Sequence, residues 1–218
     1  MTDEVIPLAS ATIILLRPSD AGLEVLMGQR HSSHSFMPNR FVFPGGRVDD
    51  EDALSSGFSE ALPSARDDQE PSLCPEMRLT LARTALRETL EETDLLIGRP
   101  ADISSAAPGS APIWQAYAEK GLRPAFEDLM LIGRAITPPP SHKRFDARFF
   151  LADGRLAHGD LPVDGDSGEL LDLAWRPVAQ LTGLKMPTIT KILLNIAVKA
   201  WKNDGPTLPD EPFEFTTI

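Results

Sequence analysis

Three glutamates between Arg87 and Leu95 have the side chains and the spacing needed to bind a metal ion. Glu88, Glu91 and Glu92 occupy positions i, i+3 and i+4, so a helix would carry them on one face. Like charges at these spacings repel by roughly a few tenths of a kcal/mol per pair on an exposed helix. Divalent cations relieve that repulsion, because Mg²⁺ prefers carboxylate oxygens and bridges to substrate phosphates. A solvated charged face is the commoner explanation, so the assignment depends on a companion stretch.

That companion is FVFPGGRVDD, at residues 41–50. FPGG followed by RETLEET resembles the signature of the Nudix hydrolases, whose box reads Gly, five residues, Glu, seven residues and then Arg-Glu-U-x-Glu-Glu-x-Gly-U, where U is bulky and apolar. Those enzymes cleave nucleoside diphosphates linked to another group. Their box forms a loop–helix–loop, so the resemblance implies an α/β fold, an α/β/α sandwich with a mixed central sheet. The matching positions are Arg87, Glu88, Glu91, Glu92 and Leu95.

The resemblance also implies a role for each matched residue. The three glutamates would be catalytic metal ligands for Mg²⁺ or Mn²⁺, and the backbone carbonyl of Gly45 would join them. Arg87 would orient the glutamates by charge-assisted hydrogen bonds. We expect Pro44, Gly45 and Gly46 to end a strand, and Gly46 to allow a close approach of main chain that a Cβ would obstruct.

An insertion splits the box. Counting back from Arg87, the pattern expects Gly at 73 and Glu at 79, but these positions hold Leu73 and Leu79, and Gly46 lies 27 residues before position 73. We therefore place an insertion at residues 47–75. Its first glutamate has two candidate replacements, Glu76 and Glu70, between which the sequence does not choose.

Two further departures fall inside and beside the helix. Thr89 stands where an apolar residue is expected, and Asp94 replaces the glycine that ends the helix in a left-handed conformation. Asp tolerates that conformation better than most residues. The acidic run 49–52 is interpreted as a solvated start of the insertion, outside the metal shell.

The large insertion resembles the branch that contains peroxisomal coenzyme A diphosphatases and their bacterial relatives. The stretches ITPPPSHKRFDARFF and GLKMPTITKILLNIA agree with that branch. Arg30 precedes Phe43 by 13 residues, as the coenzyme A pattern requires, whereas the other three positions hold His31, Ser35 and Asn39. The resemblance therefore implies a pyrophosphohydrolase, with coenzyme A or acyl-CoA as the first substrate hypothesis and ADP-ribose or NADH as alternatives.

Other residues could contact the substrate or activate water. Arg30, Arg144 and Arg148 are the substrate-binding candidates, although Arg148 could equally pair with Asp146 on a sheet. The general base would be a box glutamate or Glu169. A non-catalytic nucleotide-sensing module with the same fold is the rival hypothesis. A small-molecule nucleoside diphosphate derivative is the expected partner, with a homodimer as a further option.

Hydrophobic periodicity predicts the elements that must position these residues. A helix from Pro75 to Thr93 carries an apolar stripe at spacings of three and four, and residues 113–121 and 187–201 predict two more helices. We expect one domain over residues 1–218, with an irregular tail at 203–218. The predicted strands cover residues 9–17, 23–29, 40–43, 128–138 and 144–152, with another beginning at 169.

Composition and charge argue against nucleic-acid-binding, disulfide-bonded and membrane-spanning classes of protein. The chain has 218 residues, a net charge of −11 and a pI near 4.8, which argues against clamping nucleic acid by its phosphates. Its single cysteine, Cys74, excludes an intrachain disulfide and fits a reducing compartment. The acidic start MTDEV is unlike a signal peptide, and ATIILL is too short to span a bilayer. We expect a cytoplasmic protein without a membrane partner.

Overall fold

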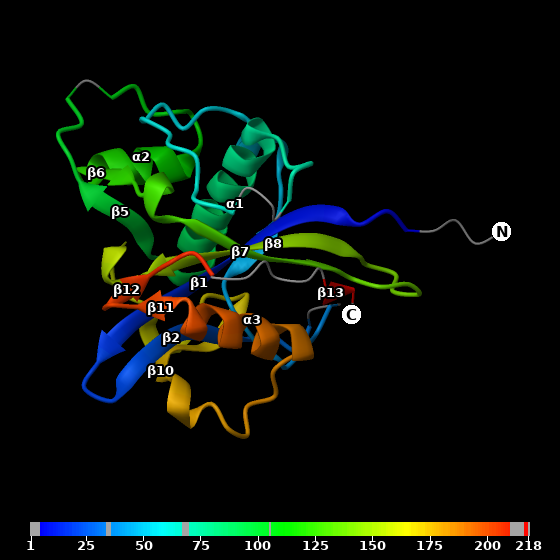
Figure 1. The fold of residues 1–218 in the computed structure, drawn as a ribbon. Helices are drawn as coiled ribbons and strands as arrows, with labels where there is room; N and C mark the ends of the chain where they lie inside the picture. Colours follow the sequence, from blue (N-terminus) through cyan, green and yellow to red (C-terminus); the bar gives the residue numbers. More distant parts are fainter. Residues whose placement is uncertain (1–4, 34–35, 67–69, 105, 210–215, 218) are drawn as a thin grey trace.

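A mixed β-sheet forms the centre of the molecule (Figure 1). The computed structural model describes residues 5–33, 36–66, 70–104, 106–209 and 216–217, so Ser35 and parts of the insertion and tail lie outside the described residues. Within these ranges the sheet has the order β10-β2-β1-β8-β7-β13, with β3 beside β2 and β4 beside β1. Its strands are β1 (Leu8–Ser19), β2 (Gly22–Arg30), β3 (Phe41–Val42), β4 (Gly45–Arg47), β7 (Met130–Ile136), β8 (Phe145–Asp153), β10 (Leu170–Pro177) and β13 (Thr216–Thr217).

The central strand β1 is buried on both faces. It pairs parallel with β8 and antiparallel with β2 and β4. Ile13 and Leu15 belong to one hydrophobic cluster, whereas Ile14 and Leu16 belong to another. A strand covered on both sides reads as a continuous apolar run, which explains the stretch ATIILL.

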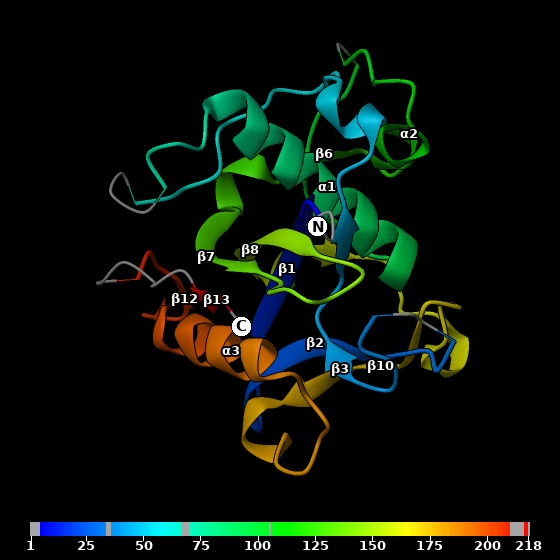
Figure 2. The ribbon, with the colours of Figure 1, turned by 90° about the vertical axis from the view of Figure 1, so that its right-hand side faces the viewer.

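Helices cover the two faces of the sheet, α1 on one side and α3 on the other (Figure 2). Helix α1 (Pro75–Thr93) contributes Ala82 and Leu86 to the first cluster, and α3 (Thr188–Lys199) contributes Leu193 and Ala197 to the second. This arrangement confirms the α/β fold class with a mixed central sheet. Among the described residues, no helix combines the length and apolar character that a membrane span requires.

Smaller elements complete the fold. Helix α2 (Pro112–Glu119) lies beside a three-stranded sheet of β6, β5 and β9, and β11 pairs with β12. The bounds of these strands are β5 Leu96–Pro100, β6 Leu122–Pro124, β9 Ala157–His158, β11 Trp201–Lys202 and β12 Gly205–Pro206. Single 3₁₀ turns are η1 (Asp50–Ala53), η2 (Phe126–Asp128), η3 (Gly154–Leu156), η4 (Val163–Gly165) and η5 (Val178–Gln180).

Helix α1 has the predicted bounds. Pro75 opens it, where a missing N–H costs nothing. Asp94 ends it with φ 58° and ψ 15°, and its N–H donates to the Leu90 carbonyl. The prediction that an aspartate would take the left-handed position is confirmed.

Strand β3 ends at Val42, before Pro44, as predicted, but Gly45, Gly46 and Arg47 then form a second short strand, β4, against β1. One prediction about the chain path is wrong. The tail is not irregular throughout, because β12 pairs with β11 and β13 extends the sheet in parallel beside β7. Short strands of two residues carry too little alternation to be seen in the sequence.

Candidate active site

The glycines of β4 bring main chain against the acidic face of α1. A Cβ on Gly46 would collide with the carboxylate of Glu88, and one on Gly45 would collide with the main chain of β1 at Ala11. Gly45 has a φ of 152°, which other residues rarely adopt, and a Cβ on Gly46 would displace the carboxylate of Glu88. The close approach predicted for Gly46 is present. The strand and the helix, far apart in sequence, therefore meet at the glutamates.

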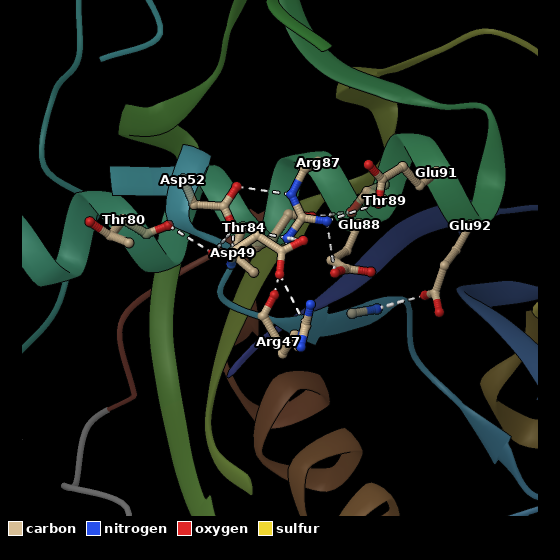
Figure 3. Close-up of polar contacts among 12 residues, drawn as sticks. Arg47, Asp49, Asp52, Thr80, Thr84, Arg87, Glu88, Thr89, Glu91 and Glu92 are labelled. Carbon is tan, nitrogen blue, oxygen red and sulfur yellow. Dashed lines mark hydrogen bonds and ion pairs between the residues drawn. The ribbon is translucent and has the colours of Figure 1, made fainter. Parts of the chain in front are cut away.

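Glu92 is the most deeply buried of the three glutamates, at 3% exposed. Its Oε2 accepts a hydrogen bond of 2.8 Å from the Gly45 N–H (Figure 3). Burial raises the pKa of Glu92 to about 8. The Gly45 hydrogen bond and the charge of Arg30 oppose that rise, while Glu88 and Glu169 add to it. This carboxylate is thus held in place by the Gly45 N–H in buried surroundings that favour its neutral form.

Glu88 lies one turn earlier and is in a similar state. Burial raises its pKa to about 7, against the attraction and hydrogen bond of Arg87. The charges of Glu91 and Glu169 raise it further. Burial therefore disfavours the ionised forms of both carboxylates, and a bound cation would favour them.

Arg87 connects the glutamates to the start of the insertion. Its Nη1 donates to Glu88 at 2.9 Å and to Glu91 at 2.8 Å. Its Nε and Nη2 donate to the two carboxylate oxygens of Asp52, at 2.9 and 2.8 Å (Figure 3). Burial alone would lower the pKa of Arg87, but these three acidic neighbours raise it above its ordinary value. The orienting role that the resemblance implied for Arg87 matches these contacts.

Asp52 was expected to be solvated, and that expectation is wrong. It is 3% exposed, and it also accepts hydrogen bonds from Thr84 Oγ1 at 2.8 Å and from the Asp49 N–H at 2.9 Å. Five residues separate Gly46 from Asp52, which is the spacing of the box between its glycine and its first acid. Counting forward from Gly46, rather than back from Arg87, would have found it.

Asp52 therefore takes the place for which Glu76 and Glu70 were considered. Glu76 is exposed in the first turn of α1. Glu70 is buried against Arg148, with an Oε1 to Nη2 distance of 2.5 Å. The insertion accordingly begins after Asp52 and not at Arg47.

The three arginines expected to bind substrate lie in different surroundings. Arg30, at the end of β2, is close enough to Glu92 to lower its pKa. Arg144 is buried and donates to the carbonyls of Val5 and Thr137, both at 2.8 Å. Arg148 is buried and pairs with Asp146 at 2.8 Å as well as with the insertion. The last two hold the protein together internally, so we correct their assignment and keep only Arg30.

The three glutamates expected to bind a metal ion have side chains engaged in other contacts in this structure. Among the described residues, no group of three His, Cys, Asp or Glu side chains is arranged to hold a metal ion. Glu91 is 56% exposed and drawn to Arg87, and Glu92 is held by the Gly45 N–H. All three stand within one and a half turns of α1.

Comparison with known proteins finds solved structures of similar fold. No protein-family model matches the sequence, and no curated protein matches it. The crystal structure of a Nudix hydrolase from Alicyclobacillus acidocaldarius is similar, with a TM-score of 0.66 and 27% identity over 88% of this chain and 91% of that one. A MutT Nudix hydrolase from Burkholderia pseudomallei has a TM-score of 0.50 and 15% identity over 88% and 98% of the two chains. The MutT protein from Methanosarcina mazei Go1 has a TM-score of 0.50 and 14% identity over 89% and 94%.

Proposed function

We propose that this hydrolase of the Nudix fold, which acts on pyrophosphate bonds, depends on Mg²⁺ or Mn²⁺ and cleaves the diphosphate of a nucleoside diphosphate derivative. One observation carries the proposal: Glu88, Glu91 and Glu92 crowd one side of α1 at the point where Gly45 and Gly46 admit main chain. Two of these carboxylates are buried with raised pKa values.

The donor set fits a hard divalent cation. Carboxylate and backbone carbonyl oxygens are the ligands that Mg²⁺ and Mn²⁺ accept, and the chain offers the three glutamates and the Gly45 carbonyl. When bound, such a cation would offset charge on the diphosphate and lower the pKa of a coordinated water. The cation would also stabilise the ionised forms of Glu88 and Glu92, which burial disfavours.

The residues of the chain position the reactants and handle the proton. Arg87 fixes the directions of Glu88 and Glu91 through charge-assisted hydrogen bonds. Arg30 brings positive charge to the same region and would bind a phosphate oxygen of the substrate. Cleavage of a phosphorus–oxygen bond asks little covalent chemistry of the protein, so positioning and electrostatics carry the step.

We assign the general base to Glu169. This exposed residue precedes β10, and its backbone carbonyl accepts from the His31 N–H at 3.2 Å. Its charge raises the pKa of Glu88 and of Glu92, so it lies near enough to both for electrostatic interaction. We expect Glu169→Gln to lower kcat by roughly 100-fold, in the range of general-base losses, while Mn²⁺ binding is retained. A kcat equal to that of the unaltered enzyme would assign the base to a box glutamate.

Coenzyme A or an acyl-CoA is the proposed substrate, supported by the position of the insertion and by Arg30. The test is a panel of coenzyme A, ADP-ribose and NADH with Mg²⁺ or Mn²⁺, with products analysed by mass spectrometry. Coenzyme A should yield 4′-phosphopantetheine and 3′,5′-ADP. Cleavage of ADP-ribose or NADH alone would keep the chemistry and change the substrate. Binding without turnover of any diphosphate would indicate a nucleotide sensor instead.

A further inference from the structure

We propose that Glu60, inside the insertion, is a positioning residue for the metal-binding glutamates, and that it acts through Arg83 and Asp52. The inference rests on the proposed function, because it concerns the same metal site. It gives the segment that splits the box a part in assembling that site.

The first step is a buried ion pair between the insertion and α1. The side chains of Glu60 and Arg83 are 11% and 7% exposed. Arg83 Nε donates to Glu60 Oε1 at 2.9 Å, and Nη2 donates to Oε2 at 2.5 Å. Glu60 also accepts from the Ser56 N–H at 2.8 Å. A two-point pair of this kind fixes direction as well as distance.

The second step leads from Arg83 to Asp52. The remaining terminal nitrogen, Nη1, donates to the backbone carbonyl of Asp52 at 3.2 Å. One edge of the guanidinium therefore binds Glu60 in the insertion, and the remaining nitrogen binds the short turn η1 that carries Asp52. Neutralising Glu60 would leave Arg83 free to reorient, and the carbonyl of Asp52 would lose its fixed donor.

The third step reaches the glutamates themselves. The carboxylate of Asp52 receives both Nε and Nη2 of Arg87, and Nη1 of Arg87 reaches Glu88 and Glu91. An unbroken series of hydrogen bonds thus runs from Glu60 to two of the proposed metal ligands. A shift of η1 would be passed to the glutamates through Arg87.

The split box explains why such a support is needed. The family pattern places seven residues between its first acid and its arginine, a connection short enough to hold the two together. Here 34 residues separate Asp52 from Arg87, and closing a longer loop costs more conformational entropy. Glu60 and Arg83 replace the lost covalent constraint with a contact in space.

A second anchor of the insertion provides a matched control. Glu70 is buried and pairs with Arg148 on β8 and with Arg134 on β7, the latter at 3.2 Å. This anchor attaches the insertion to the sheet and shares no hydrogen bond with Asp52 or Arg87. Glu70→Gln and Glu60→Gln each remove one charge from a buried pair in the same segment, so a general loss of stability would affect both alike.

The experiment measures Mn²⁺ affinity of the full chain by electron paramagnetic resonance, without substrate, after circular dichroism has confirmed folding. Losses of residues behind metal ligands typically cost about 10- to 100-fold in affinity, so we expect Glu60→Gln to weaken Mn²⁺ binding about 10-fold and Glu70→Gln less than about twofold. Arg83→Lys keeps a charge for Glu60 but cannot also reach the Asp52 carbonyl. Arg83→Lys should weaken Mn²⁺ binding as much as Glu60→Gln does. It is the replacement test if Glu60→Gln does not fold. The double variant Glu60→Gln/Arg83→Lys should bind no more weakly than the worse single variant.

The outcomes separate the two claims. Equal Mn²⁺ affinity of Glu60→Gln, Arg83→Lys and the unaltered protein would overturn the positioning role while leaving the proposed function intact. Equal losses in Glu60→Gln and Glu70→Gln would also overturn it, because the effect would then be general stability. No Mn²⁺ binding by the unaltered protein would instead refute the proposed metal site, and the positioning role with it.

Discussion

Replacing Glu92 by glutamine should make the metal-free protein more stable at alkaline pH, although it removes a proposed metal ligand. Glu92 is 3% exposed, and burial is the main cause of a pKa raised from 4.5 to about 8. Glutamine imitates the protonated carboxyl group in size and neutrality. It also retains an oxygen that can accept the hydrogen bond of the Gly45 N–H.

The sign follows from where the proton resides. Between about pH 4.5 and 8, folded Glu92 keeps a proton that the unfolded chain has released. The folded state therefore binds more protons, and the free energy of unfolding falls as pH rises through this window. One pKa unit corresponds to about 1.4 kcal/mol, so the full loss above pH 8 is at most about 5 kcal/mol. Glu88, with its pKa near 7, contributes a loss of the same sign.

The assay is urea unfolding in EDTA at pH 5.5, 7 and 9. The difference in unfolding free energy between Glu92→Gln and the unaltered protein should grow by about 2 to 3.5 kcal/mol from the lowest to the highest pH. Glu91→Gln is the matched control, because its side chain is 56% exposed, and its difference should stay within about 0.5 kcal/mol. Saturating Mg²⁺ should restore stability at pH 9 in the unaltered protein more than in Glu92→Gln. Parallel pH curves for Glu92→Gln and the unaltered protein would refute the reasoning.

Three further predictions concern the same site. Glu91→Gln and Glu92→Gln should each lower kcat roughly 100-fold or more with circular dichroism unchanged, since each removes a proposed ligand; near-normal turnover would remove that residue from the metal shell. Gly46→Ala should cost about 1 to 3 kcal/mol in urea unfolding and weaken Mn²⁺ binding, because its Cβ meets Glu88; unchanged binding would contradict the close approach. Asp52→Asn should cost about 3 kcal/mol by the same assay, because it breaks a buried ion pair; a cost under about 0.5 kcal/mol would mean that the pair does not support the fold.

The sequence was sufficient for the helix that carries the glutamates. Its apolar spacing, Pro75 at its start and Asp94 at its end are local signals, and local signals determine where a helix begins and ends. The central strands were likewise predictable, because a strand buried on both faces is a continuous apolar run. The close approach of main chain at Gly46 followed from the resemblance and not from any local pattern, whereas its contact with Glu88 appears only in the structure.

The remaining parts of the site depend on contacts between distant segments. Asp52 looked like one member of a solvated acidic run, and only the fold shows that Arg87 and Thr84 surround it. Arg148 had two equal interpretations, and the structure shows it paired with Asp146 and also with Glu70, a residue 78 positions away in the chain. Charged side chains carry no periodic signal of burial, because whether they are buried is decided by the partner they meet.

The kind of contact that attaches the insertion determines how firmly it can hold the residues beside Arg87. Its two anchors described above are buried ion pairs, Glu60 with Arg83 and Glu70 with Arg148. Buried pairs contribute little net stability, because desolvation offsets their attraction, but breaking one leaves an uncompensated charge. Two apolar surfaces can shift past each other with a small loss of interaction energy. A pair joined by two hydrogen bonds loses that energy when either side chain is displaced, because the bonds depend on distance and angle. An attachment of this kind fixes the direction of Arg83 beside Asp52, and the orientation of Arg87 depends on Asp52.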